Sequence, residues 1–330
     1  MRLRNVLILA AALLPSAAAM AQDPQPDNAM IITIQDENAS ISSSSLTDRF
    51  YTNGLRLGWT GPTGMVPDFL HDIGDTLWGP SMQRISIDLS QQMYTPANTS
   101  VSPANPHDRP YAGYLAANFS LVGDTPDHRS VLMLSLGVIG PAAGAEALQN
   151  SFHTLIGQGH DAGWGSQIPN TPAIEFLHER TWRVPIAPLG ALDTDMLPAL
   201  TLAVGDVRDY VQVGGVVRIG QGLDSDFGVP RLRPGLSGGD AYTPTRPFAW
   251  YLFAGLDGQA VMYDILLQNN PIRSGPHVGT IWDVGELEAG AAIMAYGMRF
   301  TFAWVAQTPE FEGQRGGLHQ FGSASLALRF

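Results

Sequence analysis

Apolar and polar side chains alternate with a period of two over much of this 330-residue chain. In Leu55-Arg56-Leu57-Gly58-Trp59 the apolar side chains point one way, and segments 85–90 and 325–330 repeat the arrangement. A period of two is typical of β-strands with two different faces. The alternating segments run to about ten residues or more, the length that a tilted strand needs to cross a bilayer. The pattern therefore favours strands of a membrane β-barrel.

A soluble β-sandwich would show the same alternation, with its apolar faces packed into a core. Aromatic residues near the expected strand ends favour the barrel, because aromatic girdles mark both interfaces of a barrel in lipid. These residues are Tyr51, Trp59, Tyr94, Tyr114, Trp182, Trp250 and Trp304. Lipid also excludes unpaired strand edges, so strands there close into a barrel. We therefore expect an all-β fold, a transmembrane antiparallel up-and-down β-barrel.

The patterning predicts about twelve strands, an even number, as a single-chain bacterial barrel requires. They cover residues 29–37, 50–60, 83–94, 110–122, 129–138, 172–184, 196–205, 209–220, 246–268, 286–296, 298–307 and 319–330. Asp257-Gly258 would also suit a hairpin turn. A turn there would make the count odd, so we interpret 246–268 as one long strand with a bend.

The segment 139–171 departs from the strand pattern. Residues 145–157 have helical spacing, which predicts a short helix in an extracellular loop, with Gly157 as its C-cap. Four apolar residues share one face of that helix, and Gln149 and His153 lie next to it. The four are Leu148, Phe152, Leu155 and Ile156. A second short helix is expected within 64–79.

The first residues predict export. Two arginines precede an apolar run at 6–14, and Ala19-Met20-Ala21 then offers a small-x-small cleavage site. We expect a signal peptide at 1–21 and one barrel domain at 22–330, in a bacterial outer membrane as a multi-pass β-barrel. Every later apolar run is too short for a membrane-spanning helix.

Composition and motifs argue against several functions. The formal net charge of -12 argues against a nucleic-acid partner, which needs clustered Lys and Arg. The chain has no Cys, which argues against a disulfide scaffold. The sequence does not contain the His-x-x-x-His spacing of zinc proteases.

Strand order supplies a prediction about a site. With an even strand count and both termini in the periplasm, loops 38–49, 95–109 and 139–171 lie outside the cell. Five polar clusters then meet at one rim: Asp36 and Glu37, Tyr51 and Thr52, Gln91 and Tyr94, Asp108 to Tyr111, and the helix with His153. Each cluster also has a structural explanation, such as a wet lumen, turn chemistry or a surface ion pair. Their convergence favours a site at the outer rim.

At these clusters the sequence resembles the outer-membrane lipid A 3′-O-deacylase family. The matching segments are 32–37, 47–54, 91–96, 108–113, 137–141 and 149–157, with Gly163-Trp164 downstream, so the resemblance covers roughly residues 29–172. It implies a twelve-stranded barrel with its site at the extracellular end, between barrel wall and membrane. It also implies removal of the 3′-linked acyloxyacyl group of lipid A by ester hydrolysis, with calcium required.

Carried over by position, the family's catalytic histidine falls on His153 and its active-site threonine on Thr52. Its Asn-Asp pair falls on Asp36-Glu37, although a shifted alignment would use Glu37-Asn38. The pair here is Asp-Glu, and the longer Glu changes the reach of the ligand.

The family's acidic residue after the histidine aligns with Gly159. Gln158 or Asp161 would then have to supply the oxygen ligand that this acidic residue provides in the family. The loss of a carboxylate would weaken calcium binding.

The resemblance implies metal-assisted hydrolysis, in which neutral His153 takes a proton from water and Ca²⁺ stabilises the oxyanion. We expect catalytic roles for His153, Glu37, Asp36 and Thr52, and metal ligands at Glu37, Thr52 and Asp161. We expect contacts with lipid A, or lipopolysaccharide, at Gln91, Tyr94, Arg109, Tyr111 and Gln149, in a protein that acts as a monomer. The alternatives are a non-enzymatic outer-membrane barrel (a narrow pore, an adhesin or an inactive relative) and a soluble periplasmic β protein.

Overall fold

The computed structural model describes residues 26–41, 48–232, 240–270 and 274–330. They form one large antiparallel sheet with two short α-helices, α1 (Asp68–Trp78) and α2 (Ala145–Leu155). No helix among them is long and apolar enough to cross a membrane. The predicted signal peptide lies outside the described residues.

Thirteen strands are assigned within the described residues. They are β1 (Ile31–Asn38), β2 (Phe50–Thr60), β3 (Met82–Thr95), β4 (Ala112–Asp124), β5 (His128–Ile139), β6 (Thr171–Trp182), β7 (Val184–Leu189), β8 (Leu192–Gly205), β9 (Arg208–Gln221), β10 (Phe248–Asp264), β11 (Asp283–Ala295), β12 (Met298–Gln307) and β13 (His319–Arg329).

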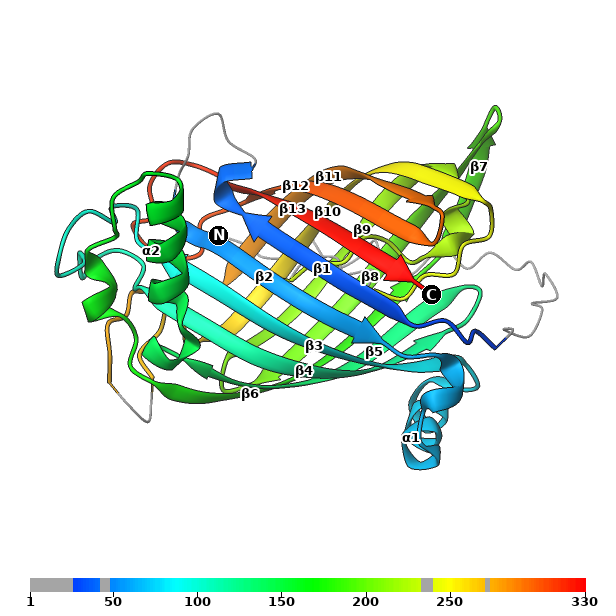
Figure 1. Cartoon of the computed structure of the whole chain (residues 1–330), viewed down its shortest axis with the longest axis horizontal. Coiled ribbons are helices and arrows are strands. Elements are labelled where there is room, and N and C mark those ends of the chain that lie inside the picture. Colours follow the sequence, from blue (N-terminus) through cyan, green and yellow to red (C-terminus); the bar gives the residue numbers. More distant parts are fainter. Residues whose placement is uncertain (1–25, 42–47, 233–239, 271–273) are drawn as a thin grey trace, which may run out of the picture.

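Pairing between β6 and β8 closes this sheet into a barrel (Figure 1). The short strand β7 pairs with the first residues of β8, so β6 and β7 occupy one position in the wall. The wall therefore has twelve positions, and the expected antiparallel up-and-down barrel of twelve strands is confirmed. Figure 1 places α2 at one end and α1 at the other. Because Ile31 pairs with Arg329, the chain enters and leaves the barrel at the same end.

The structure confirms the predicted long strand at 246–268 and adds a hairpin before the predicted strand at 196–205. Residues 248–264 form a single strand, in which Asp257 pairs with Glu286, and the irregularity falls between Val261 and Tyr263. The prediction of one long strand in this region is confirmed. The predicted strand 196–205 begins four residues after the observed start of β8 at Leu192, and the hairpin that β8 makes with β7 was not predicted. Prolines in β7 cannot donate to a sheet, and they concealed this edge strand in the sequence.

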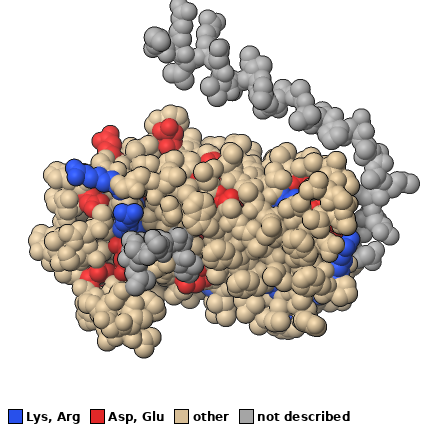
Figure 2. Space-filling view, turned by 90° about the horizontal axis from the view of Figure 1, so that it is seen from above, with Lys and Arg blue, Asp and Glu red and all other residues tan. Residues whose placement is uncertain are grey.

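The two faces of the wall have opposite chemistry. Outward side chains are apolar and exposed, as at Ile34, Leu57 and Leu89. Inward side chains are charged and buried, as at Arg84 and Arg218. In Figure 2 the visible face is mostly uncharged between its two ends. An apolar exterior around a polar interior is the arrangement of a membrane barrel, and a soluble sandwich would have the reverse.

In the segment between β9 and β10, the described residues 222–232 and 240–247 include charged side chains that are buried in the barrel interior. Arg56 of the wall pairs with Asp240 of this segment at 2.6 Å, and Arg231 lies 3.5 Å from Glu37. Arg218 contacts Asp195 at 2.6 Å and Asp226 at 2.7 Å. Buried ion pairs therefore tie this interior segment to the wall.

Arg218→Ala should destabilise the barrel by about 3–5 kcal/mol, because buried Asp195 loses its close cation and buried Asp226 keeps only Arg299, at 3.1 Å. The matched control is Arg246→Ala, whose pair with Asp193 is half exposed and 4.0 Å long, and which should change stability by at most about 1 kcal/mol. Urea unfolding in detergent micelles measures both free energies of unfolding. Equal effects of the two substitutions would contradict the structural role of the interior pairs.

Candidate functional site

Helix α2 covers the outer face of the wall with its polar side. Its buried residues are Ala145, Gln149 and His153. Gly113 of β4 lets it approach closely, since a Cβ there would collide with Ala145. Gln149 accepts a hydrogen bond of 2.8 Å from the indole of Trp164. Helix α2 is therefore held against the wall by contacts that leave its apolar side free.

That apolar side is exposed. Its residues are Leu148, Phe152, Leu155 and Ile156, and Leu155 is 82% exposed. They are the four residues expected to share one face. An apolar face turned outward next to an apolar barrel wall is suited to contact with lipid.

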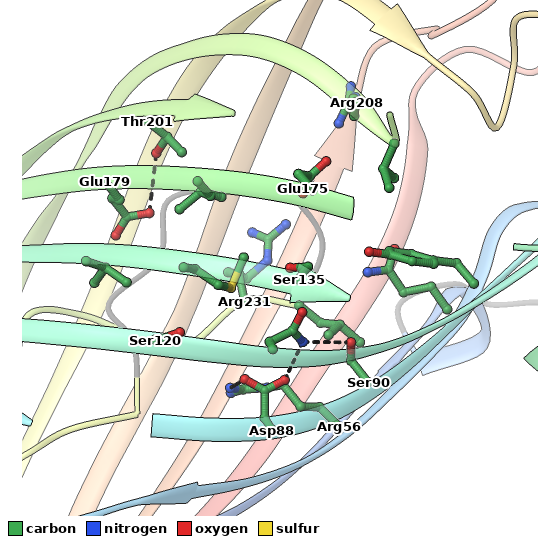
Figure 3. Close-up of a pocket in the computed structure, with 18 of the residues that line it drawn as sticks. Arg56, Asp88, Ser90, Ser120, Ser135, Glu175, Glu179, Thr201, Arg208 and Arg231 are labelled. Atoms are coloured by element: carbon green, nitrogen blue, oxygen red, sulfur yellow. Dashed lines mark hydrogen bonds and ion pairs between the residues drawn. The ribbon is translucent and has the colours of Figure 1, made fainter. Parts of the chain in front are cut away.

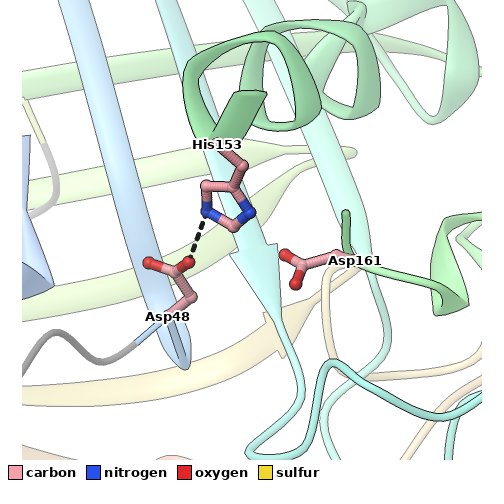
Figure 4. Close-up of side chains that lie close together, drawn as sticks. All are labelled: Asp48, His153 and Asp161. Carbon is pink, nitrogen blue, oxygen red and sulfur yellow. Dashed lines mark ion pairs between the residues drawn. The ribbon is translucent and has the colours of Figure 1, made fainter. Parts of the chain in front are cut away.

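His153 is the centre of a small cluster of ionisable groups beneath α2 (Figure 4). Its Nε2 lies 2.7 Å from Oδ2 of Asp48, and its Nδ1 lies 3.0 Å from the carbonyl oxygen of Gly159. Asp161 completes the cluster, and one ligand atom from each of the three residues lies within 4.8 Å of the others. Segments 48–49 and 157–162 thus meet at the base of α2.

Both ring nitrogens of His153 face acceptors. A neutral ring has one N–H; in the tautomer that donates it from Nδ1 to the Gly159 carbonyl, Nε2 carries a lone pair that faces the Asp48 carboxylate. Two hydrogen-bond acceptors that lie 2.7 Å apart are unfavourable unless a bound donor or a cation satisfies them. In that tautomer the cluster is suited to binding a hydrogen-bond donor or a cation.

Asp161 has an unsatisfied carboxylate oxygen. Its Oδ2 is buried and has no hydrogen-bond partner. Burial raises the pKa of Asp161 above its ordinary value, while a hydrogen bond with Thr99 and the charge of His153 oppose the rise. A buried oxygen of this kind beside a second carboxylate fits a hard divalent cation such as Ca²⁺. Asp48 and Asp161 are the residues that would hold it.

The wall beside α2 presents further polar groups outward. A β-bulge between Tyr51 and Asn53 turns Thr52 toward Thr95, with hydroxyl oxygens 2.7 Å apart. Asn53 donates a hydrogen bond of 2.7 Å to Asp36. Asp36 and Thr52 therefore lie on the face of the wall that α2 covers.

The structure does not bring Glu37 to this cluster. Successive strand residues point to opposite faces, so Glu37 points into the lumen while Asp36 points out. There Glu37 accepts hydrogen bonds from the Tyr51 hydroxyl at 2.9 Å and the Leu232 amide at 2.9 Å.

The five expected substrate contacts are divided between the two faces. Tyr94 and Arg109 lie in the lumen, where Arg109 stacks over the Tyr94 ring and pairs with Glu310 at 2.6 Å. Tyr111 and Gln149 pack around Trp164 outside the wall. Gln91 donates a hydrogen bond of 2.6 Å to the Ala143 carbonyl. The three outer residues support the loop that carries α2.

The lumen offers a second candidate site. A cavity of about 170 Å³ in the lumen is lined by inward residues, among them Arg56, Asp88, Glu175 and Arg208 (Figure 3). It contains no histidine, and Asp88 already accepts a hydrogen bond from Asn118. The His153 cluster on the other side of the wall is the better candidate for chemistry.

The interpretation of the sequence missed Asp48. This residue lies in the matched segment 47–54 and four residues before Thr52, but nothing in the sequence indicates that it contacts a histidine 105 positions later. The contact depends on how the loop before β2 meets the loop after α2.

Comparisons with known proteins agree with this fold. A family model described as outer membrane protein LpxR matches residues 6–330. Among solved structures, LpxR from Salmonella typhimurium is similar over 90% of this chain and 99% of its own, with a TM-score of 0.74 and 20% sequence identity. The β domain of the Bordetella autotransporter BrkA is less similar, with a TM-score of 0.40 and 11% identity over 92% of this chain and 98% of its own. A comparison with curated protein sequences finds no match.

Asp161→Asn should stabilise its loop at neutral pH in the absence of divalent cations. A raised pKa in the folded state means that ionised Asp161 opposes folding, so stability is present at low pH and is lost as the pH rises through the raised pKa. Hydrogen exchange of residues 157–167 should therefore slow in the variant at pH 7, and its protection should depend less on pH than in the wild type. Faster exchange in the variant would contradict this account of Asp161.

Proposed function

Because the chain belongs to the family of the outer membrane protein LpxR, we propose that it hydrolyses the 3′-linked acyloxyacyl ester of lipid A. The observation that supports this most is the position of His153, outside the barrel wall and beneath a helix with an exposed apolar side. An ester at the boundary between head groups and acyl chains could reach such a site without leaving the membrane. The proposed substrate surface is therefore the outer leaflet.

The proposed base is His153. The Gly159 carbonyl holds Nδ1–H, which presents Nε2 as the atom that takes a proton. A water molecule that donates a hydrogen bond to Nε2 would be positioned for attack on the acyl carbonyl. Once Nε2 is protonated, Asp48 at 2.7 Å stabilises the imidazolium, which then donates its proton to the leaving alkoxide.

The proposed cofactor is Ca²⁺, held by Asp48 and Asp161. When bound, it would stabilise the negative charge that develops on the carbonyl oxygen and reduce repulsion between this acidic chain and the lipid A phosphates. Thr52 and Asp36 lie on the same face of the wall and are further oxygen donors. Glu37 has no part in this proposal, because its carboxylate is engaged in the lumen.

We also propose that the protein acts as a monomer. All three members of the cluster come from one chain, and the barrel closes without a partner. The rival interpretation is an inactive relative, since Gly159 stands where the family has an acidic residue. Asp161 is two residues away and supplies a carboxylate in its place.

His153→Ala should reduce deacylation by at least about 100-fold, the lower range of general-base catalysis. The control is His160→Ala, seven residues further along in an exposed position, which should keep its activity. Mass spectrometry of lipid A from cells that express each variant measures the loss of the acyloxyacyl group. Unchanged deacylation by His153→Ala would overturn the mechanism, and no deacylation by the wild type would favour the inactive relative.

Calcium binding is tested without reference to activity. Terbium occupies calcium sites, and Trp164 near Asp161 is a suitable donor for sensitised emission. Asp48→Asn and Asp161→Asn should each weaken terbium affinity at least tenfold, since each removes one charged ligand. Glu146→Gln, an exposed acid at the start of α2, should leave the affinity unchanged. Equal affinity in all four proteins would mean that no cation binds at the cluster.

A further inference from the structure

Helix α1 has an exposed apolar side that the proposed chemistry does not use. It connects β2 to β3 at the end of the barrel opposite α2 and projects sideways from the wall (Figure 1). Met65, Phe69, Ile73 and Leu77 are between 41% and 65% exposed. Phe69, Ile73 and Leu77 repeat every four residues, so they share one helix face. In water such a face would be an unfavourable apolar patch.

Contacts with the wall prevent α1 from turning this face inward. The indole of Trp78 donates a hydrogen bond of 3.1 Å to His178 of β6. Gln83 of β3 donates to the Asp75 carboxylate at 2.8 Å and to the His71 carbonyl at 3.1 Å. Gly74 packs directly on Gln83, where a Cβ would collide with the amide. The side of α1 that contacts the barrel is therefore fixed, and the apolar side remains free.

The outward residues of β6 indicate how deep α1 lies. Ile174 and Phe176 are apolar and exposed, as expected where a strand contacts hydrocarbon. The next outward residues are His178, Arg180 and Trp182, and Arg180 donates to the Ser130 hydroxyl at 2.9 Å. A change from apolar residues to Arg and Trp is typical of the head-group level. Trp78 contacts His178, so α1 docks at this level.

We propose that α1 lies in the head-group region of the periplasmic leaflet and inserts Phe69, Ile73 and Leu77 among the acyl chains. The partner is a phospholipid surface, because α1 is bound to the lipid-facing side of the wall at the level of Arg180 and Trp182 and leaves its apolar side exposed there. Asp68 and Asp72 are exposed and lie about 100° around the helix from Phe69 and Ile73, on the side that would face the periplasmic water. A short helix held rigidly in this way fixes the depth of the barrel in the membrane. This inference does not depend on the proposed hydrolysis.

The chain has no cysteine, so a single introduced cysteine carries a spin label at one known place. Ile73→Cys and its neighbour Asp72→Cys are compared in phospholipid vesicles, with Leu89→Cys on the lipid-facing wall as the reference. The accessibility of each label to oxygen and to a water-soluble nickel complex gives its depth.

The label at 73 should collide with oxygen several-fold more often than with the nickel complex, as at 89, and the label at 72 should show the reverse ratio. High nickel accessibility at both positions would mean that α1 projects into water. A label at 73 that neither reagent reaches would mean that a protein or a second copy covers the face. Either result would overturn the proposal.

Discussion

Lipid provides no hydrogen-bond partners for the backbone, and this single constraint organises the molecule. Every strand that crosses the membrane must pair on both sides, so the sheet closes, as it does where β6 meets β8. Once the wall is closed, neighbouring residues on a strand face different surroundings. Asp36 therefore faces outward while Glu37 lies among buried charges in the lumen. The bulge at Thr52 changes this alternation locally and places a hydroxyl on the outer face.

Much of the fold could be predicted because its determinants are local. The period of two located β12 at its observed bounds, 298–307, and located β3 within one residue at each end. Helical spacing in 145–157 and 64–79 predicted α2 and α1. The family resemblance then proposed His153 as the catalytic residue, and the structure places this residue outside the wall. Each of these features depends on residues that are close in the sequence.

The parts that escaped prediction depend on distant contacts or on one step of register. Asp48 meets His153 only after two loops come together. Which of Asp36 and Glu37 faces outward depends on the position of the first strand to a single residue. The segment between β9 and β10 shows no regular pattern, yet its Arg231 and Asp240 are buried in the lumen. Such partners are recognised by complementary charge after folding, and periodicity does not reveal them.

The account depends most on the claim that α2 and the His153 cluster lie on the outer side of the membrane. Labelling of single cysteines in intact cells by a membrane-impermeant maleimide tests this directly. A cysteine at the exposed position 160, beside the cluster, should be labelled in intact cells. One at 127, in the exposed turn between β4 and β5, should be labelled only after the membrane is permeabilised. The reverse pattern would place the cluster in the periplasm and contradict the account.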